Sequence, residues 1–210
     1  MTNQVLEAIM KRRSIVRFKS DSIDQDKIQS ILEAGRWAPS WLNMQPWRFI
    51  IIEDRKMKEQ ISSIVPSVFN LSIKDAPVCV VTCVNSKTDP FHFIEDGTAA
   101  TQNMALAAHS LGLGTSWIGI FSLENERKSS ERKLKDLLNV PKDWRVISIL
   151  PIGVPKFKET KTRKELAQLT NYETFTEQDK RKILQQKIEK PKQRIEEVLD
   201  HLDPISTPPV

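Results

Sequence analysis

The sequence is poor in cysteine and glycine. Its 210 residues include two cysteines and six glycines, together with twelve prolines, which excludes collagen-like repeats and a disulfide-dense scaffold. Cys79 and Cys83 lie in one apolar stretch. Their even spacing would place both on one face of an extended strand, beyond easy disulfide reach of each other. A reducing compartment, by default the cytoplasm, is therefore expected.

Long apolar runs are also absent. No stretch approaches the roughly 20 apolar residues that a membrane-spanning helix needs. Residues 1–14 lack the apolar region and the cleavage site of a secretory signal, so we expect no membrane contact. Apolar residues make up 39% of the chain and charged residues 28%, proportions typical of a globular protein with a buried core.

The signatures of several enzyme classes are missing as well. The sequence has no GxSxG, HExxH, Walker A or CxxC motif. Its three histidines, His92, His109 and His201, are too scattered to predict a metal site. Residues 111–115, LGLGT, contain two glycines of a dinucleotide-binding loop, but they follow a predicted helix instead of a strand. They predict a helix C-cap and a tight turn.

What is present is a modest net charge of +5, which raises the alternative of nucleic-acid binding. Basic residues gather between positions 180 and 194. However, acidic residues are interspersed among them, and no aromatic residue beyond Phe175 is placed to stack on bases. A solvated surface of mixed charge is the simpler interpretation.

Hydrophobic periodicity predicts an α+β protein. Helices are expected at residues 5–10, from Asp24 to before Pro39, and at 56–65, 94–111 and 131–138. Strands are expected at 48–52, 78–84, 115–121 and 145–153. The first two elements are helices and the strands are unevenly spaced, which argues against a doubly wound fold. The strand at 78–84 is almost continuously apolar and is expected to be buried on both faces.

The composition changes near residue 176. Residues 1–175 are expected to form one domain, and residues 176–210 a C-terminal helical arm rich in Lys and Gln. Four apolar residues form one stripe along this arm: Ile195, Val198, Leu199 and Leu202. The stripe must pack against its own subunit or a partner.

Residues 11–18, KRRSIVRF, place cations where the first predicted helix ends. Arg12 and Arg13 offer fork-shaped donors and Ser14 adds a hydroxyl, which are the groups that a phosphomonoester needs. The alternative is that the cations complement the negative end of the helix dipole.

Residues 38–47, APSWLNMQPW, form a second unusual segment. Its prolines restrict the backbone, while Ser40, Asn43 and Gln45 present hydroxyl and amide groups. Such groups suit the donors and acceptors of a planar heterocycle. The alternative is an ordinary structured loop with its own side chain-to-backbone turns.

Together these segments resemble the nitroreductase family of FMN-dependent flavoproteins. The family pattern is a basic-basic-Ser segment near residue ten, followed by an APSxxNxQPW-type loop. An alanine-rich helix leading into GLGT, a strand ending in glycine and a late Lys-x-Arg come next. This sequence has these pieces in order within roughly residues 4–175, at 12–14, 39–47, 96–115, 117–119 and 161–163.

The resemblance implies a mixed sheet flanked by helices, and an intertwined homodimer with two FMN sites at its interface. One subunit would hold the FMN phosphate with Arg12, Arg13, Ser14, Lys161 and Arg163. The other subunit would line the isoalloxazine ring with Pro39, Ser40, Asn43 and Gln45. The backbone amides of Ile118 and Gly119 would face flavin N5, and Asn70 would face the pyrimidine side.

The resemblance also implies an oxidoreductase whose chemistry is carried by the cofactor, without a catalytic side chain. NAD(P)H would deliver hydride to the flavin and leave. A small acceptor, such as a nitroaromatic or a quinone, would then take the electrons in a ping-pong cycle. The alternative among flavoproteins is a non-catalytic FMN carrier or sensor.

Val16 departs from the family pattern. Many relatives have Arg or Lys at this place, near the flavin N1–O2 edge, where negative charge accumulates on reduction. Unless Arg17 compensates, reduced flavin is expected to be less stabilised here, which leaves the preferred acceptor open.

Overall fold

The computed structural model describes residues 3–122, 129–157 and 160–175. The chain divides into two compact units, residues 1–160 and 161–210. In its described part, the second unit has one 3₁₀ turn at Leu166–Gln168. The predicted arm at 176–210 lies outside the described residues, so it stays a prediction.

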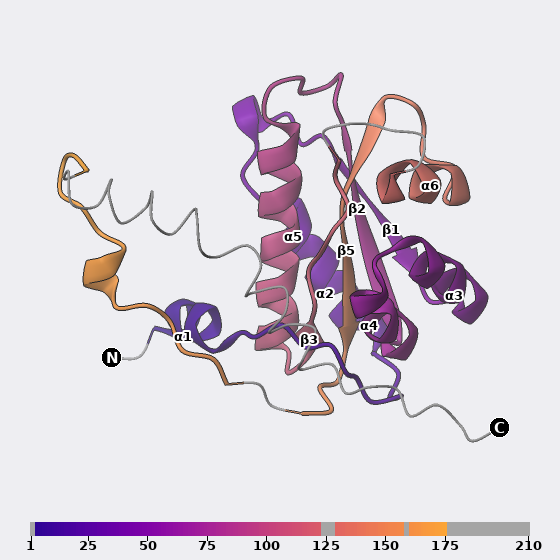
Figure 1. Cartoon of the computed structure of the whole chain (residues 1–210), viewed down its shortest axis with the longest axis horizontal. Helices are drawn as coiled ribbons and strands as arrows, with labels where there is room; N and C mark the ends of the chain where they lie inside the picture. Colours follow the sequence, from indigo (N-terminus) through magenta and orange to yellow (C-terminus); the bar gives the residue numbers. More distant parts are fainter. Residues whose placement is uncertain (1–2, 123–128, 158–159, 176–210) are drawn as a thin grey trace. The chain divides into compact units, whose positions relative to one another are not determined.

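The first unit is built on an antiparallel sheet that has helices on both faces (Figure 1). Its strands are β1 (Trp47–Ile52), β2 (Val78–Asn85), β3 (Gly114–Thr115), β4 (Ile118–Gly119) and β5 (Trp144–Gly153). The strand order is β1-β2-β5-β3, and β4 also pairs with β5. Every pairing is antiparallel. The α+β prediction is therefore confirmed.

The helices form two groups. Helices α2 (Gln25–Arg36) and α5 (Phe93–Ser110) cover one face of the sheet. Helices α3 (Arg55–Ile64), α4 (Asn70–Asp75) and α6 (Ser130–Leu137) cover the other (Figure 1). Small residues let α2 and α5 approach closely: a Cβ added at Gly35 would lie 2.8 Å from Met104 Cγ.

Strand β2 contributes side chains to the hydrophobic clusters on both faces of the sheet, as its continuous apolar sequence predicts. Successive side chains of a strand point to opposite faces. Cys79 and Cys83 accordingly pack with the α3, α4 and α6 cluster, and Val80 packs with the α2 and α5 cluster. Both cysteines are free thiols. Burial raises the pKa of each to about 12, so neither thiol is reactive near neutral pH.

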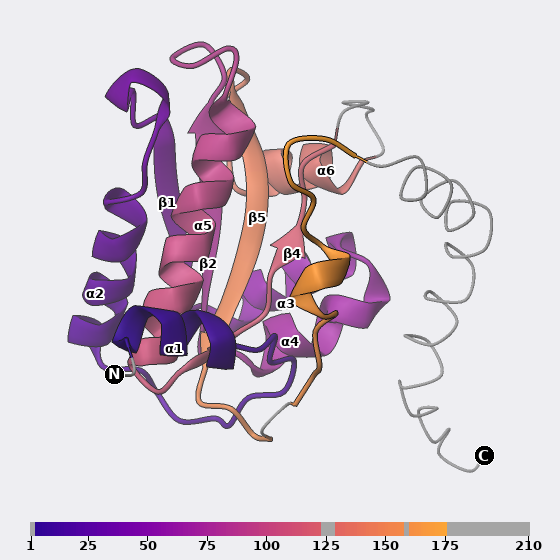
Figure 2. The same cartoon turned by 90° about the vertical axis from the view of Figure 1, so that its left-hand side faces the viewer.

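Helix α1 (Gln4–Lys11) lies across the C-terminal end of α5 (Figure 2). The Asn3 side chain caps its start by accepting hydrogen bonds from the Val5 and Leu6 amides. None of its residues is buried. Its four large apolar residues are at least half exposed, at 65% for Val5, 57% for Leu6, 50% for Ile9 and 71% for Met10.

The strand predicted at 115–121 is interrupted. Strands β3 and β4 pair with β5 in one continuous register, Thr115 with Ile152 and Ile118 with Ile149. Between them, the Ser116 amide donates to Pro151 O at 3.3 Å. Proline has no N–H to return that bond, so the ladder breaks there.

Helix α4 was not predicted. It is six residues long, and it follows a 3₁₀ turn at Ser67–Phe69. A segment this short does not display a helical period.

Candidate functional site

A cavity of about 410 Å³ opens where α1 and α5 end. Its lining comes from the last turns of both helices, from the segments that follow them and from the chain after β5: Lys11, Arg12, Arg13, Ile15, His109, Gly112, Leu113, Gly114, Thr115, Pro155, Phe157 and Thr160. Three permanent cations and one histidine are thus gathered around a single hollow. Arg12 and Arg13, two of the predicted phosphate-binding residues, are among them.

Local geometry joins the two principal walls of this cavity. Gly112 has a φ of +79°, and its amide donates to His109 O at 3.0 Å, which confirms the predicted C-cap and turn. The chain then runs beside the segment after α1, where the Ile15 amide donates to Thr115 O at 2.8 Å and Ser14 bridges Thr115. Gly114 permits this approach, because a Cβ there would lie 2.7 Å from Ile15 Cγ1.

Arg13 is held in place by the end of α1. Its Nη1 donates to Met10 O at 2.6 Å and to Arg12 O at 2.8 Å. Its Nε is buried and has no hydrogen-bond partner among the described residues. Because a buried unsatisfied donor is unfavourable, this nitrogen is a donor available to a ligand.

His109 reflects the positive potential of the cavity. Burial lowers the pKa of its imidazole, and the charges of Arg12, Arg13 and Lys11 lower it further. Burial disfavours charge of either sign, but the part of the shift that comes from the three cations shows a positive potential, which attracts an anion. The sequence analysis did not assign His109 to the site, because no local pattern connects α5 to the end of α1.

The 38–47 loop has an unusual backbone. Three non-glycine residues adopt positive φ: Leu42 at 46°, Asn43 at 58° and Gln45 at 49°. Inside the turn, the Gln45 amide donates to Ser40 Oγ at 3.0 Å. Gln45 Nε2 donates to Asn43 O and Oδ1, both at 3.2 Å. The structure thus brings together three of the predicted ring-lining residues, with Pro39 adjacent and exposed.

This loop and the cavity lie at opposite ends of α5. The Trp41 amide contacts Asp96, in the first turn of the helix, whereas His109, in its last turn, lines the cavity. At 1.5 Å per residue, these two positions are about 20 Å apart along the helix. Within one subunit, the predicted ring-lining and phosphate-binding groups are therefore not brought together.

Strand β4 offers exposed backbone at Gly119. Ile118 is buried, but a Cβ added at Gly119 would have no atom within 4 Å. Asn70, the first residue of α4, has a buried Oδ1 without a partner among the described residues. Gly119 thus leaves space for a ligand, and Asn70 Oδ1 is an unused acceptor.

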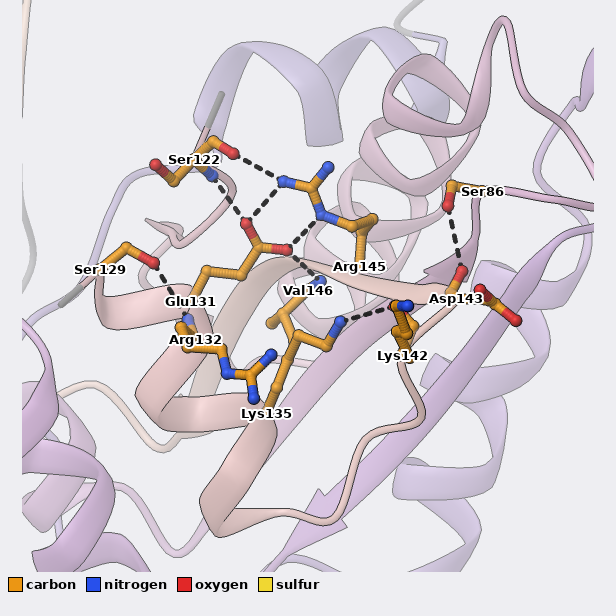
Figure 3. A network of polar contacts seen from close by, with 10 residues as sticks. All are labelled: Ser86, Ser122, Ser129, Glu131, Arg132, Lys135, Lys142, Asp143, Arg145 and Val146. Carbon is orange, nitrogen blue, oxygen red and sulfur yellow. Dashed lines mark hydrogen bonds and ion pairs between the residues drawn. The ribbon is translucent and has the colours of Figure 1, made fainter. Parts of the chain in front are cut away.

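An ion pair holds the chain that follows β4 (Figure 3). Glu131 accepts hydrogen bonds from Arg145 Nε at 2.7 Å and Nη2 at 2.8 Å, and from the Ser122 amide at 3.0 Å. Arg145 Nη2 also donates to Ser122 O at 2.6 Å. Burial alone would raise the pKa of Glu131, but the Arg145 and backbone donors more than offset it and hold that pKa below its usual value.

The other predicted residues are placed as follows. Val16 is 40% exposed. Arg17 Nε donates to Asp75 Oδ2 at 3.1 Å, so the cation next to Val16 already has a carboxylate partner. Lys161 and Arg163 are exposed residues of the second unit.

Metal-binding clusters and membrane-spanning helices are both absent from the described residues. No group of three or more His, Cys, Asp or Glu side chains within them is arranged to hold a metal ion. None of their helices has both the length and the apolar character needed to cross a bilayer.

Comparison with known proteins identifies the family. The model of the nitroreductase family matches residues 9–71 and 66–154. The chain belongs to the nitroreductase family.

Among its relatives is a candidate NADH dehydrogenase/NAD(P)H nitroreductase from Methanothermobacter thermautotrophicus. It is 37% identical over 153 residues, covering 72% of this chain and 77% of the relative. The FMN reductase [NAD(P)H] of Bacillus subtilis is 27% identical over 198 residues, covering 84% of this chain and 76% of the reductase.

Solved structures agree with this assignment. An FMN-dependent nitroreductase from Clostridium difficile superimposes with a TM-score of 0.73 at 26% identity, covering 81% of this chain and 99% of the other. A candidate nitroreductase from Desulfovibrio desulfuricans, solved in complex with FMN, gives a TM-score of 0.71 at 30% identity. That match covers 84% of this chain and all of the other.

Proposed function

We propose that this protein is an FMN-dependent oxidoreductase that uses NAD(P)H to reduce a small acceptor, such as a nitroaromatic or a quinone. The observation that carries the proposal is the cation-lined cavity at the ends of α1 and α5, in a chain of the nitroreductase family. Relatives named as FMN reductase and NAD(P)H nitroreductase support the reductant and the cofactor.

The residues present fit the phosphate of FMN. That group carries about −1.5 to −2 charges near neutral pH, and Arg12 and Arg13 offer fork-shaped donors to it. The unsatisfied Arg13 Nε fits the same role. Assignment of Lys161 and Arg163 to the phosphate stays a prediction from the sequence.

The residues also fit a flavin ring. The exposed backbone of Gly119 admits a planar group without a steric conflict. The buried Asn70 Oδ1 needs a donor, and an imide N–H of the pyrimidine ring is of the right kind. When bound, FMN supplies hydride acceptance from NAD(P)H and electron transfer to the acceptor, in a ping-pong order.

The complete site is proposed to need two subunits. The 38–47 loop and the cavity lie about 20 Å apart along α5 of one subunit, so a second copy must supply the loop that meets the flavin ring. The uncovered apolar face of α1 provides a surface for such a homodimer.

The test begins with the absorption spectrum of the purified protein. Flavin bands, and release of FMN on denaturation, are expected. Anaerobic mixing with NADH and with NADPH should then bleach the bound flavin rapidly. A colourless protein that does not take up FMN would refute the proposal, and a yellow protein that neither nucleotide bleaches would be a flavin carrier or sensor instead.

A further inference from the structure

Asp96 connects α5 to the 38–47 loop. Its side-chain oxygens accept the Trp41 amide at 3.1 and 3.3 Å, from a residue 55 positions away in the sequence. Asp96 is only 4% exposed, so this acceptor is fixed within the packed body of the protein. Trp41 itself is partly exposed, and its amide is one point where the loop is tied to the core, ahead of the Pro46 carbonyl, which accepts the Asn85 amide at 2.9 Å.

Ring contacts also hold Trp41 in place. The Trp41 ring meets Phe91 edge-on at 5.8 Å and lies 5.3 Å from the His92 ring. The amides of those two residues donate to Asp89 Oδ1. Asp89 is fully buried. Two buried acidic residues thus support Trp41, one by accepting its backbone amide and one by holding the turn whose rings contact it.

The segment that follows Trp41 needs such support. Leu42, Asn43 and Gln45 all have positive φ, a conformation that costs roughly 1–2 kcal/mol for a residue with a Cβ. Strain of this kind persists only where surrounding contacts hold it. Within the loop, the Ser40 and Gln45 hydrogen bonds stabilise the turn but do not connect it to the core.

We propose that Asp96 is a positioning residue for the flavin-ring site. By holding the Trp41 amide, it keeps residues 42–45 in their left-handed turn and presents the Asn43 and Gln45 amides to the flavin. The inference rests on the proposed function, since it assigns a role to a buried residue behind the proposed ring-lining loop.

The energetics of Asp96 favour a positioning role over a stabilising one. Burial raises the pKa of its carboxyl group although the Trp41 amide acts to lower it, and the nearby Asp89 carboxylate adds to the rise. An ionised Asp96 is therefore unfavourable for folding near neutral pH. An apolar residue of similar volume would avoid that cost but would leave the loop without its acceptor.

The experiment compares Asp96→Leu, which keeps the branched shape and removes the acceptor, with Asp96→Asn, which keeps a carbonyl oxygen for the Trp41 amide. Glu95→Gln, an exposed carboxyl-to-amide change in the same helical turn, is the matched control. All are made in the full chain and purified with FMN. Amide hydrogen exchange over residues 38–47, the visible circular dichroism of bound FMN, and the melting temperature are measured.

We expect Asp96→Leu to speed exchange in the loop at least about tenfold, to change the flavin dichroism and to weaken FMN binding about tenfold, the loss typical of one hydrogen bond. Asp96→Asn should restore most of each signal. A lower melting temperature with unchanged loop exchange and flavin dichroism would overturn the inference. If Asp96→Leu does not fold, Asp96→Ala, which also removes the acceptor of the Trp41 amide, takes its place, and unchanged loop exchange and flavin dichroism in that variant would also overturn the inference.

The two proposals fail separately. Loop exchange is measured on the protein with or without flavin, so it decides whether Asp96 holds the turn even if the wild-type chain binds no FMN. Absence of FMN from the wild type would contradict the proposed function alone.

Discussion

Arg12 and Arg13 stand where α1 leaves its last carbonyls without helical partners. Arg13 satisfies the Met10 and Arg12 carbonyls with Nη1, so these cations serve both the helix end and the cavity. The sequence left two roles open for these arginines, complementing the helix dipole and binding a phosphate. The two roles are therefore compatible. The Arg13 Nε that lacks a partner among the described residues is the feature that points to a ligand.

The first prediction concerns Arg12. Arg12→Ala should weaken FMN binding by about 1.5–3 kcal/mol, the loss expected for a charge-assisted hydrogen bond. Fluorescence titration of the flavin measures it. Arg36→Ala is the control, because Arg36 is exposed on α2 and paired with Glu33. Arg163→Ala tests the sequence-based assignment of that residue in the same way, and unchanged affinity in both variants would refute the phosphate site.

His109 gives a pH-dependent prediction. Its pKa lies below the usual 6.5, so it is neutral at pH 7 in the flavin-free protein. A phosphate in the cavity favours the imidazolium and raises that pKa. At a pH between the His109 pKa of the flavin-free protein and that of the complex, His109 takes up a proton when FMN binds. The contribution of His109 to FMN affinity is therefore full below the lower pKa and is lost as pH rises through the higher one.

Titrations of wild type and His109→Gln between about pH 5.5 and 8.5 test this, around the range where histidine changes charge. The FMN dissociation constant of His109→Gln, divided by that of the wild type, should be largest at low pH. The second ionisation of the phosphate itself, near pH 6, affects both proteins and cancels in the ratio. His92→Gln, outside the cavity, should show a flat ratio, and the same flat result for His109→Gln would contradict the prediction.

Val16→Arg should raise the midpoint potential of bound FMN. A cation there would attract the negative charge that forms on reduction, and Arg17 is already paired with Asp75. The shift should be on the order of 30 mV, which corresponds to about 1.4 kcal/mol for a two-electron couple. Anaerobic titration against a reference dye measures it. A potential that stays constant or falls would show that residue 16 does not face the ring.

At the scale of elements, strands β3 and β4 show how one proline shapes the edge of the sheet. They keep a single register on β5, but Pro151 cannot complete the ladder between them. The Glu131–Arg145 pair then holds Ser122 beyond β4 by both its N–H and its C=O (Figure 3). The exposed backbone at Gly119 is thus fixed on both sides.

Gly119 gives a prediction for this edge. In Gly119→Val the new side chain enters open space, and a β-branched residue suits a strand, so the melting temperature should hardly change. FMN affinity should fall about tenfold or more, since the side chain occupies the proposed place of the ring.

Gly35→Val is the contrasting variant. Its Cβ would meet Met104 and Phe49, so it should destabilise the fold by about 1–3 kcal/mol through overpacking. Thermal unfolding and flavin titration of both variants separate packing from binding. Full FMN affinity in Gly119→Val would exclude β4 from the site.

At the scale of the whole molecule, the proposed sharing of the site between two subunits would make FMN retention depend on assembly. Val5→Asp together with Ile9→Asp places two charges on the exposed apolar face of α1. This variant should dissociate more readily and lose FMN at low micromolar concentration, while its isolated subunit stays folded. Light scattering and the flavin spectrum of one sample measure both effects. Glu7→Gln, also on α1, is the control, and a stable monomer with full flavin would exclude the shared site.

The sequence by itself determined the features that depend on near neighbours. Periodicity specified the α+β class, the buried β2 strand and the helix end at Gly112, and the ordered set of five segments within residues 12–163 carried the family resemblance. The helices and strands follow from local backbone preference and from the spacing of apolar side chains. Both can be read directly from the order of residues.

Only the tertiary structure decided how these parts are combined. It separated the 38–47 loop from the phosphate cavity by the length of α5, and it brought His109 beside Arg12 and Arg13. It also joined Asp96 to Trp41 and Glu131 to Arg145. Such contacts link residues far apart in the sequence through packing, and no local pattern encodes which distant partner a buried carboxylate will meet.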